Sequence, residues 1–522
     1  MSKLETFMFV SLIGFSWLLS FFTHTPSVGF DDANITQAYA QNIANGHGYV
    51  YNIGGERVEG STSLLWTAIN ILAFITPYPI VLLHVLSVLI TSGVVLYSTR
   101  IAQELSDSNN IFYVNLTLFS FFPFFFGWGL FSLMDITLFI LLIVYSIFTV
   151  IGNTKKKLSW VLVLTAFLLP LARPEGILVV LGIFIIWKLF YEDFERKILT
   201  GWSIVISGAL SLAVATFCRL TYFGYPFPNT FYAKTSDDVI GQLIQGVQYL
   251  GKTAVIPQNF ALLMMITLSI TFFSNIKSAK IHKYIYAVSL LTLGAIVTYI
   301  YLGGDHFNGG RFYQFMIPLF LPIVSAYITR LIEPSLVGKI NVMGWILATI
   351  VFAVFIVSSA AYYEFGGKFR HEFRIAEGGR KTASLVNDLL GNKYSVGVIT
   401  AGGFRMGYDG IVYDVLGLNW TEMAHSTRST DTTVLKNHGG FSEEVFFKAL
   451  PEIFNPEMKG CDSSIKDGFF DSEFQLQLTK NVTQSQNFEK LYGIFCNEKM
   501  TFFGLRKYSG EFASNGFTEL RV

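Results

Sequence analysis

The chain has 522 residues, of which 52% are hydrophobic and only 14% are charged, and its formal net charge is +1. Soluble domains usually contain about 25% charged residues. The composition therefore excludes an ordinary water-soluble protein and indicates an integral membrane protein. The net charge says nothing about nucleic acid, but no basic block in the sequence indicates nucleic acid as a partner, and none is expected.

Apolar runs close to the roughly 20 residues that cross a bilayer recur along most of the chain. We therefore expect a polytopic α-helical membrane domain over residues 1–363. The run Leu64–Ile75 is too short for a span and predicts an interfacial or re-entrant helix. No small-residue cleavage site follows Phe7–Phe22, which we interpret as an uncleaved span rather than a signal peptide. About eleven spans are expected, namely Phe7–Phe22, Pro79–Ser98, Ile111–Trp128, Leu133–Ile151, Leu158–Leu171, Ile177–Phe190, Trp202–Phe223, Phe260–Phe273, Tyr284–Leu302, Phe312–Ile328 and Val342–Tyr362.

Lys and Arg residues gather in the loops on one side of this threading. Every connection on the side of the N-terminus contains basic residues, among them Arg100, Lys156, Lys277 and Arg330. By the positive-inside rule, these connections face the cytoplasm. An odd number of spans then places the segment 364–522, which we call the tail, outside the cytoplasmic (inner) membrane.

The tail is expected to form an extracytoplasmic α/β domain, because short β-like runs and helical patterns alternate between glycine-marked turns. Of the three cysteines, Cys218 lies in an apolar run and is expected to be buried. Cys461 and Cys496 lie in the tail, and no spacing rule decides whether they pair. The predicted strands are Tyr394–Ile399 and Gly410–Val415, and the predicted helices are Arg374–Leu390 and Ser442–Leu450.

The first outer loop, residues 23–63, contains two adjacent carboxylates just beyond a predicted span. Partial desolvation and mutual repulsion can raise the pKa of one of them and make it a useful base. Asp32 precedes an amphipathic run, Ala33–Asn45, that ends at Gly46, so it is well placed to cap a helix. Asp31 is then left without a structural task, and we predict that it is the catalytic carboxylate.

Further charged residues lie at the outer ends of the predicted spans, and each has an ordinary structural explanation. A helix cap, an exposed turn, or a long side chain reaching the lipid headgroups would account for them singly. Together they favour a site at the outer interface that binds an anionic lipid headgroup. These residues are Asp135, Arg173, Glu175, Arg219, Lys234, Asp305, His306 and Arg311.

Several motifs, taken in order along the chain, resemble those of the GT-C glycosyltransferases. The closest likeness is to the branch that contains the mycobacterial terminal arabinofuranosyltransferase. The motifs are Asp31-Asp32, Gly46-His47-Gly48-Tyr49, residues 55–66, Arg173-Pro174-Glu175-Gly176, Pro228–Lys234, Gly303–Arg311 and Asp414–Asn419. They extend from the first loop into the tail, so the resemblance covers most of the chain.

The resemblance implies inverting transfer of one arabinofuranose-like sugar from a polyprenyl monophosphate to a glycan or other acceptor outside the membrane. It implies that Asp31 or Asp32 is the base and that Asp135 belongs to the same site. The leaving phosphate is negatively charged, so positioned cations can stabilise it. The expected phosphate-binding residues are Lys234, Arg311 and Arg173, and the expected sugar or acceptor residues are His47, Glu59, Asp305 and His306.

The sequence departs from the family pattern at two places. Asp135 follows Met134 where a glutamate-containing turn is expected, and Trp420 follows Asn419 where an acidic residue is more usual. The identities of sugar and acceptor therefore stay open, as does a divalent cation, Mg²⁺ or Ca²⁺, held by the carboxylates.

Two other functions remain as alternatives. One is transfer of mannose or another hexose to protein or lipid glycan from the same kind of donor. The other is a membrane transporter, which usually has ionisable groups at mid-membrane and two similar halves. The mid-span residues here are mainly Phe, Leu, Ile, Val and Ser, and no two halves align.

Overall fold

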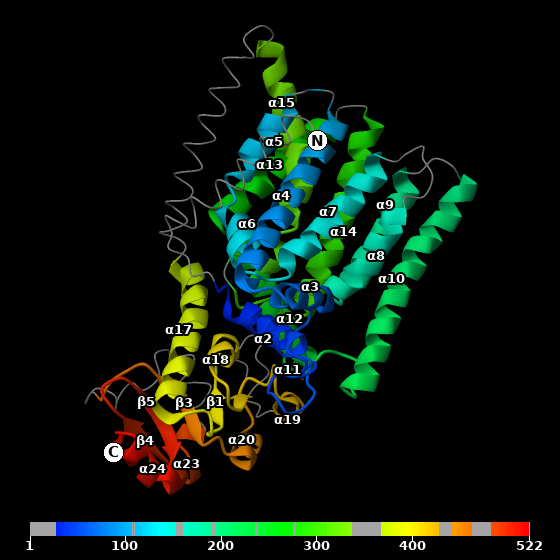
Figure 1. The fold of residues 1–522 in the computed structure, drawn as a ribbon. Coiled ribbons are helices and arrows are strands. Elements are labelled where there is room, and N and C mark those ends of the chain that lie inside the picture. Colours follow the sequence, from blue (N-terminus) through cyan, green and yellow to red (C-terminus); the bar gives the residue numbers. More distant parts are fainter. Residues whose placement is uncertain are drawn as a thin grey trace.

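The computed structural model describes residues 28–106, 108, 110–152, 160–190, 194–234, 238–274, 278–307, 309–336, 367–426, 441–461 and 482–520. The predicted spans Phe7–Phe22 and Val342–Tyr362, and the predicted domain boundary after residue 363, lie outside these residues. A helical bundle and the tail occupy opposite ends of the described part, with a layer of short helices between them (Figure 1).

Each bundle helix lies on a predicted apolar run, and the run Ile111–Trp128 is divided among three helical elements. Three of them, α4, α14 and the segment Gly201–Tyr222 of α10, are long and apolar enough to cross a membrane. A fourth span results if Ile111–Phe119 and Phe124–Phe131, bent by 78°, are counted as one. The expected number of about eleven is not established, because the apolar stretches of the other described helices are 10–17 residues long. The bundle consists of α4 (Pro79–Leu105), α5 (Ile111–Phe119), α6 (Pro123–Phe126), the π-helix η1 (Gly127–Phe131), α7 (Ile136–Gly152), α8 (Trp160–Ala172), α9 (Gly176–Phe190), α10 (Phe194–Tyr222), α13 (Pro257–Ser274), α14 (Ala279–Tyr301) and α15 (Met316–Leu336).

Packing inside the bundle combines apolar contacts with a few buried hydrogen bonds between helices. Asn115 of α5 donates to Thr99 of α4 at 3.0 Å and accepts from Ser325 of α15 at 2.8 Å. The outer face of α10 exposes large apolar side chains such as Ile206 and Phe217. Such a surface suits hydrocarbon, whereas soluble proteins rarely leave it uncovered.

The layer of short helices contains four of the predicted site residues, namely Asp31, Asp32, Lys234 and Arg311. It comprises α2 (Asp31–Ala44), α3 (Leu64–Phe74), α11 (Asn229–Lys234), α12 (Val239–Ala254) and the 3₁₀ turn η2 (Arg311–Tyr313). The predicted short helix at residues 64–75 is confirmed as α3, and Ser63 caps it by accepting from the Trp66 N–H.

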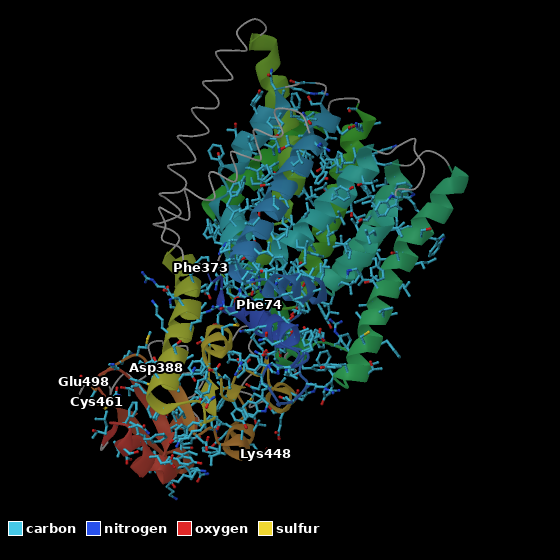
Figure 2. All side chains as sticks on the ribbon, in the orientation of Figure 1. Phe74, Phe373, Asp388, Lys448, Cys461 and Glu498 are labelled. Carbon is cyan, nitrogen blue, oxygen red and sulfur yellow. A yellow bond between two sulfur atoms is a disulfide. The ribbon has the colours of Figure 1, made fainter. Side chains whose placement is uncertain are left out.

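The helix predicted after Asp32 begins two residues earlier than expected, at Asp31 instead of Ala33. Phe30 is the N-cap of α2 and offers no side-chain acceptor, so the prediction that Asp32 caps this helix is wrong. The Phe30 ring is buried against Trp128 and Phe373, with centroid distances of 5.0 and 4.6 Å. Burial of this ring fixes where the chain enters the helix. Phe373 lies where the tail meets the bundle (Figure 2).

The tail is a small mixed sheet with helices, as predicted. The strand order is β2-β1-β3-β5-β4-β6, with β1 parallel to both β2 and β3 and the other pairs antiparallel. The predicted strands and helices correspond to β1, β2, α17 and α20. The strands are β1 (Val396–Val398), β2 (Val412–Asp414), β3 (Ile453–Glu457), β4 (Tyr492–Cys496), β5 (Thr501–Leu505) and β6 (Thr518–Leu520), and the main helices are α17 (Gly367–Leu390), α18 (Ala401–Gly407), α19 (Thr421–Ala424), α20 (Glu443–Ala449), α23 (Gln486–Leu491) and α24 (Ser509–Ser514).

The cysteines settle one open question and correct one expectation. Cys461 and Cys496 form a disulfide with a Cα–Cα distance of 5.3 Å. Cys218, which was expected to be buried, is exposed on α10. Its place in an apolar run reflects an outward-facing position on a bundle helix rather than a place in the core.

Candidate functional site

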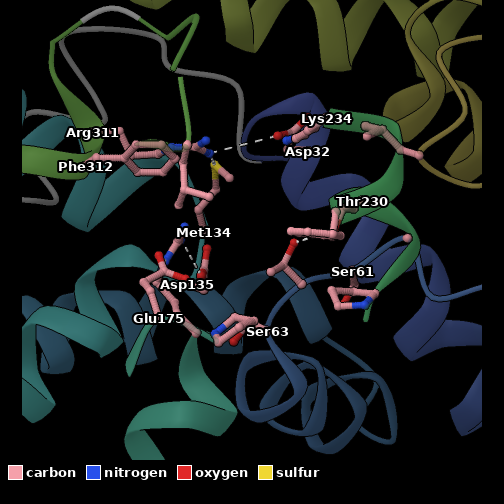
Figure 3. A pocket seen from close by; sticks show the side chains of 18 of the residues that line it. Asp32, Ser61, Ser63, Met134, Asp135, Glu175, Thr230, Lys234, Arg311 and Phe312 are labelled. Carbon is pink, nitrogen blue, oxygen red and sulfur yellow. Dashed lines mark hydrogen bonds and ion pairs between the residues drawn. The ribbon is translucent and has the colours of Figure 1, made fainter. Parts of the chain in front are cut away.

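A pocket of about 340 Å³ lies among the bundle, the first loop and α11. Its lining combines acidic, basic, hydroxyl and aromatic side chains from segments far apart in sequence. Figure 3 shows Asp32 facing Arg311 across the pocket, with Met134 next to Arg311 and Asp135 and Glu175 below them. Its polar and charged lining residues include Asp32, Thr36, Ser61, Thr62, Ser63, Asp135, Arg173, Glu175, Thr230, Lys234, Gln242, Thr298 and Arg311.

Asp31 serves as a cap for a helix of the tail and does not line this pocket. Its two carboxylate oxygens accept the backbone N–H groups of Gly402, at 3.0 Å, and Gly403, at 2.7 Å, at the start of α18. Burial raises the pKa of Asp31 to about 6, although these hydrogen bonds act in the opposite direction. A Cβ atom on Gly402 would collide with the Asp31 carbonyl oxygen, so this approach needs glycine.

Of the two adjacent aspartates, Asp32 is the one that lines the pocket. Its side chain is 24% exposed, and its Oδ2 lies 4.0 Å from Nη1 of Arg311. The two adjacent aspartates have therefore exchanged the roles expected from the sequence: Asp31 has the structural task and Asp32 faces the pocket. The physical reason is the start of α2 at Asp31, which directs the two side chains to different neighbours.

Arg311 is held rigidly at the pocket wall. Its Nε lies 2.7 Å from Oδ2 of buried Asp305, and its guanidinium lies over the rings of Phe307 and Phe312 at 4.5 and 4.9 Å. Asp305 also accepts the backbone N–H of His306 at 2.9 Å. Asp305 and His306 are not among the residues that line the pocket. Asp305 supports Arg311 from behind, and contact of either residue with a sugar stays a prediction.

Arg173 is also paired, although it was expected to bind phosphate. Its Nη1 lies 2.9 Å from Oδ2 of Asp135 and its Nε lies 2.6 Å from Oε1 of Glu175. All three residues line the pocket and all three are largely buried. Two carboxylates therefore neutralise the Arg173 charge, and Asp135 is engaged on the far side of Met134 from Asp32 (Figure 3).

Lys234, the last residue of α11, completes the cations of the pocket. The ion pairs between described residues involve Arg173 and Arg311 but not Lys234. Within the described part of the pocket, Lys234 is thus the cation with the most capacity for an incoming anion. Its role in binding a phosphate stays a prediction.

The other two predicted sugar residues, Glu59 and His47, also do not line the pocket. Glu59 forms a buried bidentate pair with Arg219 of α10, with N–O distances of 2.8 and 3.0 Å. This pair fastens the first loop to the end of α10, so Arg219 does not reach toward headgroups as expected. His47 is exposed in the turn after α2 and does not line the pocket.

Sequence reasoning missed Glu372 near the N-terminus of α17. Its pKa is raised to about 8, chiefly by burial and then by the negative charges of Asp32, Asp31 and Asp305. The helix was predicted to start at Arg374, which left this carboxylate unassigned. An available signal was its position shortly after the last apolar run, on the same side as the acidic first loop.

Comparisons with known proteins identify no family for this chain. No family model matches the chain, and no curated protein matches it in sequence. Among the described residues, no group of three or more His, Cys, Asp or Glu side chains is arranged to hold a metal ion. Asp32 faces Arg311, and Lys234 lines the same pocket, so the arrangement can accept a proton at Asp32 and stabilise negative charge at Lys234 and Arg311.

Proposed function

We propose that the chain is an inverting GT-C glycosyltransferase. It would transfer one arabinofuranose-like sugar from a polyprenyl monophosphate to a glycan acceptor at the outer face of the cytoplasmic membrane. The observation that carries the proposal is the pocket beside the apolar bundle in which Asp32 faces Arg311 and which Lys234 also lines. The resemblance of the motifs to GT-C enzymes supplies the reaction class.

Asp32 is the base in this proposal. It removes the proton from the acceptor hydroxyl while that oxygen attacks the anomeric carbon, and the bond from this carbon to the phosphate oxygen breaks on the opposite face. The electrons of that bond leave with the lipid phosphate, whose added charge Lys234 and Arg311 stabilise. Asp305 keeps Arg311 oriented, because it holds Nε at 2.7 Å while another guanidinium nitrogen faces the pocket.

The group formed by Asp135, Arg173 and Glu175 shapes the opposite wall. Because both carboxylates lie within 2.9 Å of Arg173, its positive charge is fully compensated and the group adds polarity with a formal charge of −1. We propose that Asp135 orients the donor sugar through hydrogen bonds and does not act as the base. A tail outside the membrane is consistent with the disulfide Cys461–Cys496, since disulfides persist in oxidising compartments.

The test is a transfer assay with purified protein in liposomes, using synthetic polyprenyl-phosphate pentose and polyprenyl-phosphate mannose as donors. Asp32→Asn should lower kcat by roughly 10²- to 10⁴-fold, the usual contribution of a positioned general base. Asp388→Asn, on the exposed face of α17, is the matched control and should leave the rate unchanged. Full activity of the Asp32 variant would refute the assignment, and solute uptake into vesicles without sugar transfer would favour a transporter.

A further inference from the structure

Four aromatic residues lie within the short segment from Tyr225 to Tyr232. Phe227 and Phe231 both line the pocket, yet their side chains stay 51% and 39% exposed. Their rings lie 4.8 Å apart between centroids, with an interplanar angle of 35°. Two large, neighbouring aromatic rings left exposed at a pocket indicate a surface that another molecule covers.

These rings are anchored to the tail. Asn229 donates from its amide nitrogen to the carbonyl oxygens of Gly417, at 2.7 Å, and Leu418, at 3.1 Å. His425, directly after α19, packs its ring against Tyr232 at a centroid distance of 4.1 Å. Figure 1 shows α11 beside α19, between the bundle and the tail. The aromatic surface therefore lies on the tail side of the pocket, which favours a ligand from outside the membrane over a lipid chain.

Several uncharged hydrogen-bonding groups line the same pocket as the two rings. Thr36, Ser61, Thr62 and Thr230 line the same pocket, and the hydroxyls of Thr62 and Thr230 lie 3.0 Å apart. A sugar ring presents an apolar C–H face and a rim of hydroxyls, so it is complementary to an aromatic face surrounded by hydroxyl side chains. An apolar pocket wall with a few placed polar groups is the usual form of a small-ligand site.

The position along α11 adds a distance constraint. Phe231 and Lys234 are three residues apart on this helix, so their side chains emerge on neighbouring parts of its surface. A ring that stacks on Phe231 is therefore within one helical turn of the proposed phosphate ligand. This is the spacing expected of two sugar-sized groups that meet at one reaction centre.

We propose that Phe227 and Phe231 form the acceptor subsite and stack against a terminal ring of a neutral glycan. The inference rests on the proposed transferase function, because it assigns one end of the same pocket to the acceptor. It makes these two residues determinants of acceptor binding rather than catalytic residues. The donor lipid is held elsewhere, at Lys234 and Arg311.

The experiment measures acceptor and donor dependence separately for Phe227→Ala, Phe231→Ala and the aromatic replacement Phe231→Trp. Each alanine variant should raise the KM for an oligosaccharide acceptor about tenfold, because stacking is worth about one tenfold step in affinity. The KM for the donor should stay the same, and Phe231→Trp should restore the acceptor KM. Phe217→Ala, which removes an exposed ring from α10, is the control and should change neither constant.

Direct binding keeps this inference separate from the proposed function. Wild-type protein in detergent, without donor, should bind members of a panel of neutral pentose and hexose oligosaccharides, and Phe231→Ala should lose that binding. Binding without any transfer would leave the subsite standing and reject the transferase. Transfer with an unchanged acceptor KM in both alanine variants would reject the subsite, as would binding of no glycan in the panel. A raised donor KM or lost liposome association would identify the rings as lipid contacts instead.

Discussion

Asp31 and Asp32 are adjacent in sequence, but their carboxylates serve different parts of the protein. Asp31→Asn should weaken the contact between α2 and α18, because one amide oxygen replaces two acceptors for Gly402 and Gly403. We expect a loss of about 1–3 kcal/mol in unfolding free energy, with transfer less impaired than in Asp32→Asn. Thermal unfolding and transfer rates measured on both variants would check this. An Asp31 variant that is fully stable but inactive would return the role of base to Asp31.

Raised carboxylate pKa values give stability a definite dependence on pH. The pKa of Asp31 is about 6 and that of Glu372 about 8, against ordinary values of 3.8 and 4.5, mainly because both are buried. The folded state thus binds more protons than the unfolded state, so stability is greatest at low pH and is lost as pH rises through these values. We expect the temperature of the unfolding midpoint to decrease as the pH is raised from about 5 to about 8. Glu372→Gln should make stability depend less on pH in the upper part of that window. An unchanged slope of stability against pH would show that Glu372 is not the group responsible.

At the scale of elements, the sequence predicted helices well and their ends poorly. The periodicity and length of the apolar runs predicted the position of every described bundle helix, and glycine-marked turns predicted the positions of β1 and β2. The run Ile111–Trp128 was predicted as one span, but the chain bends where Pro123 follows Phe122, since proline disfavours helix at the residue before it. The start of α2 depends on burial of Phe30 against Phe373, a contact between residues far apart in sequence. No local pattern encodes such a contact, so the roles of the two aspartates could not be assigned from sequence.

The disulfide within the tail should contribute to the stability of the sheet. It closes a loop between residues 35 apart, Cys461 and Cys496, and Cys496 is the last residue of β4. Loop-closure entropy gives about 3–4 kcal/mol for a loop of this length. Replacing both cysteines with serine should lower the unfolding midpoint of the tail and speed hydrogen exchange in β4 and β5, with the bundle unaffected. Cys218→Ser is the control, and equal exchange in both proteins would show that the crosslink adds nothing.

At the scale of the whole molecule, the pocket lies at one end of the bundle and a set of charged residues at the other. Gly246 of α12 packs against Ile300, near the C-terminal end of α14, and Lys280 near the other end of α14 pairs with Glu104 of α4 at 2.8 Å. The 23 residues of α14 correspond to a length of about 35 Å, enough for a hydrocarbon core of about 30 Å. The two ends of α14 should therefore face opposite sides of the membrane.

Thiol labelling in intact cells of variants with a single free thiol, in which the disulfide Cys461–Cys496 is kept, would test this arrangement. In a Cys218→Ser background, Asn515→Cys in the tail should react with an impermeant reagent added outside, because Asn515 is exposed. Ala279→Cys, at the exposed start of α14, should react only after the membrane is permeabilised. Reaction of both from outside would place the two ends of α14 on one side and reject α14 as a span. The reverse pattern would put the tail in the cytoplasm, where a disulfide would not persist and the proposed extracytoplasmic acceptor could not reach the pocket.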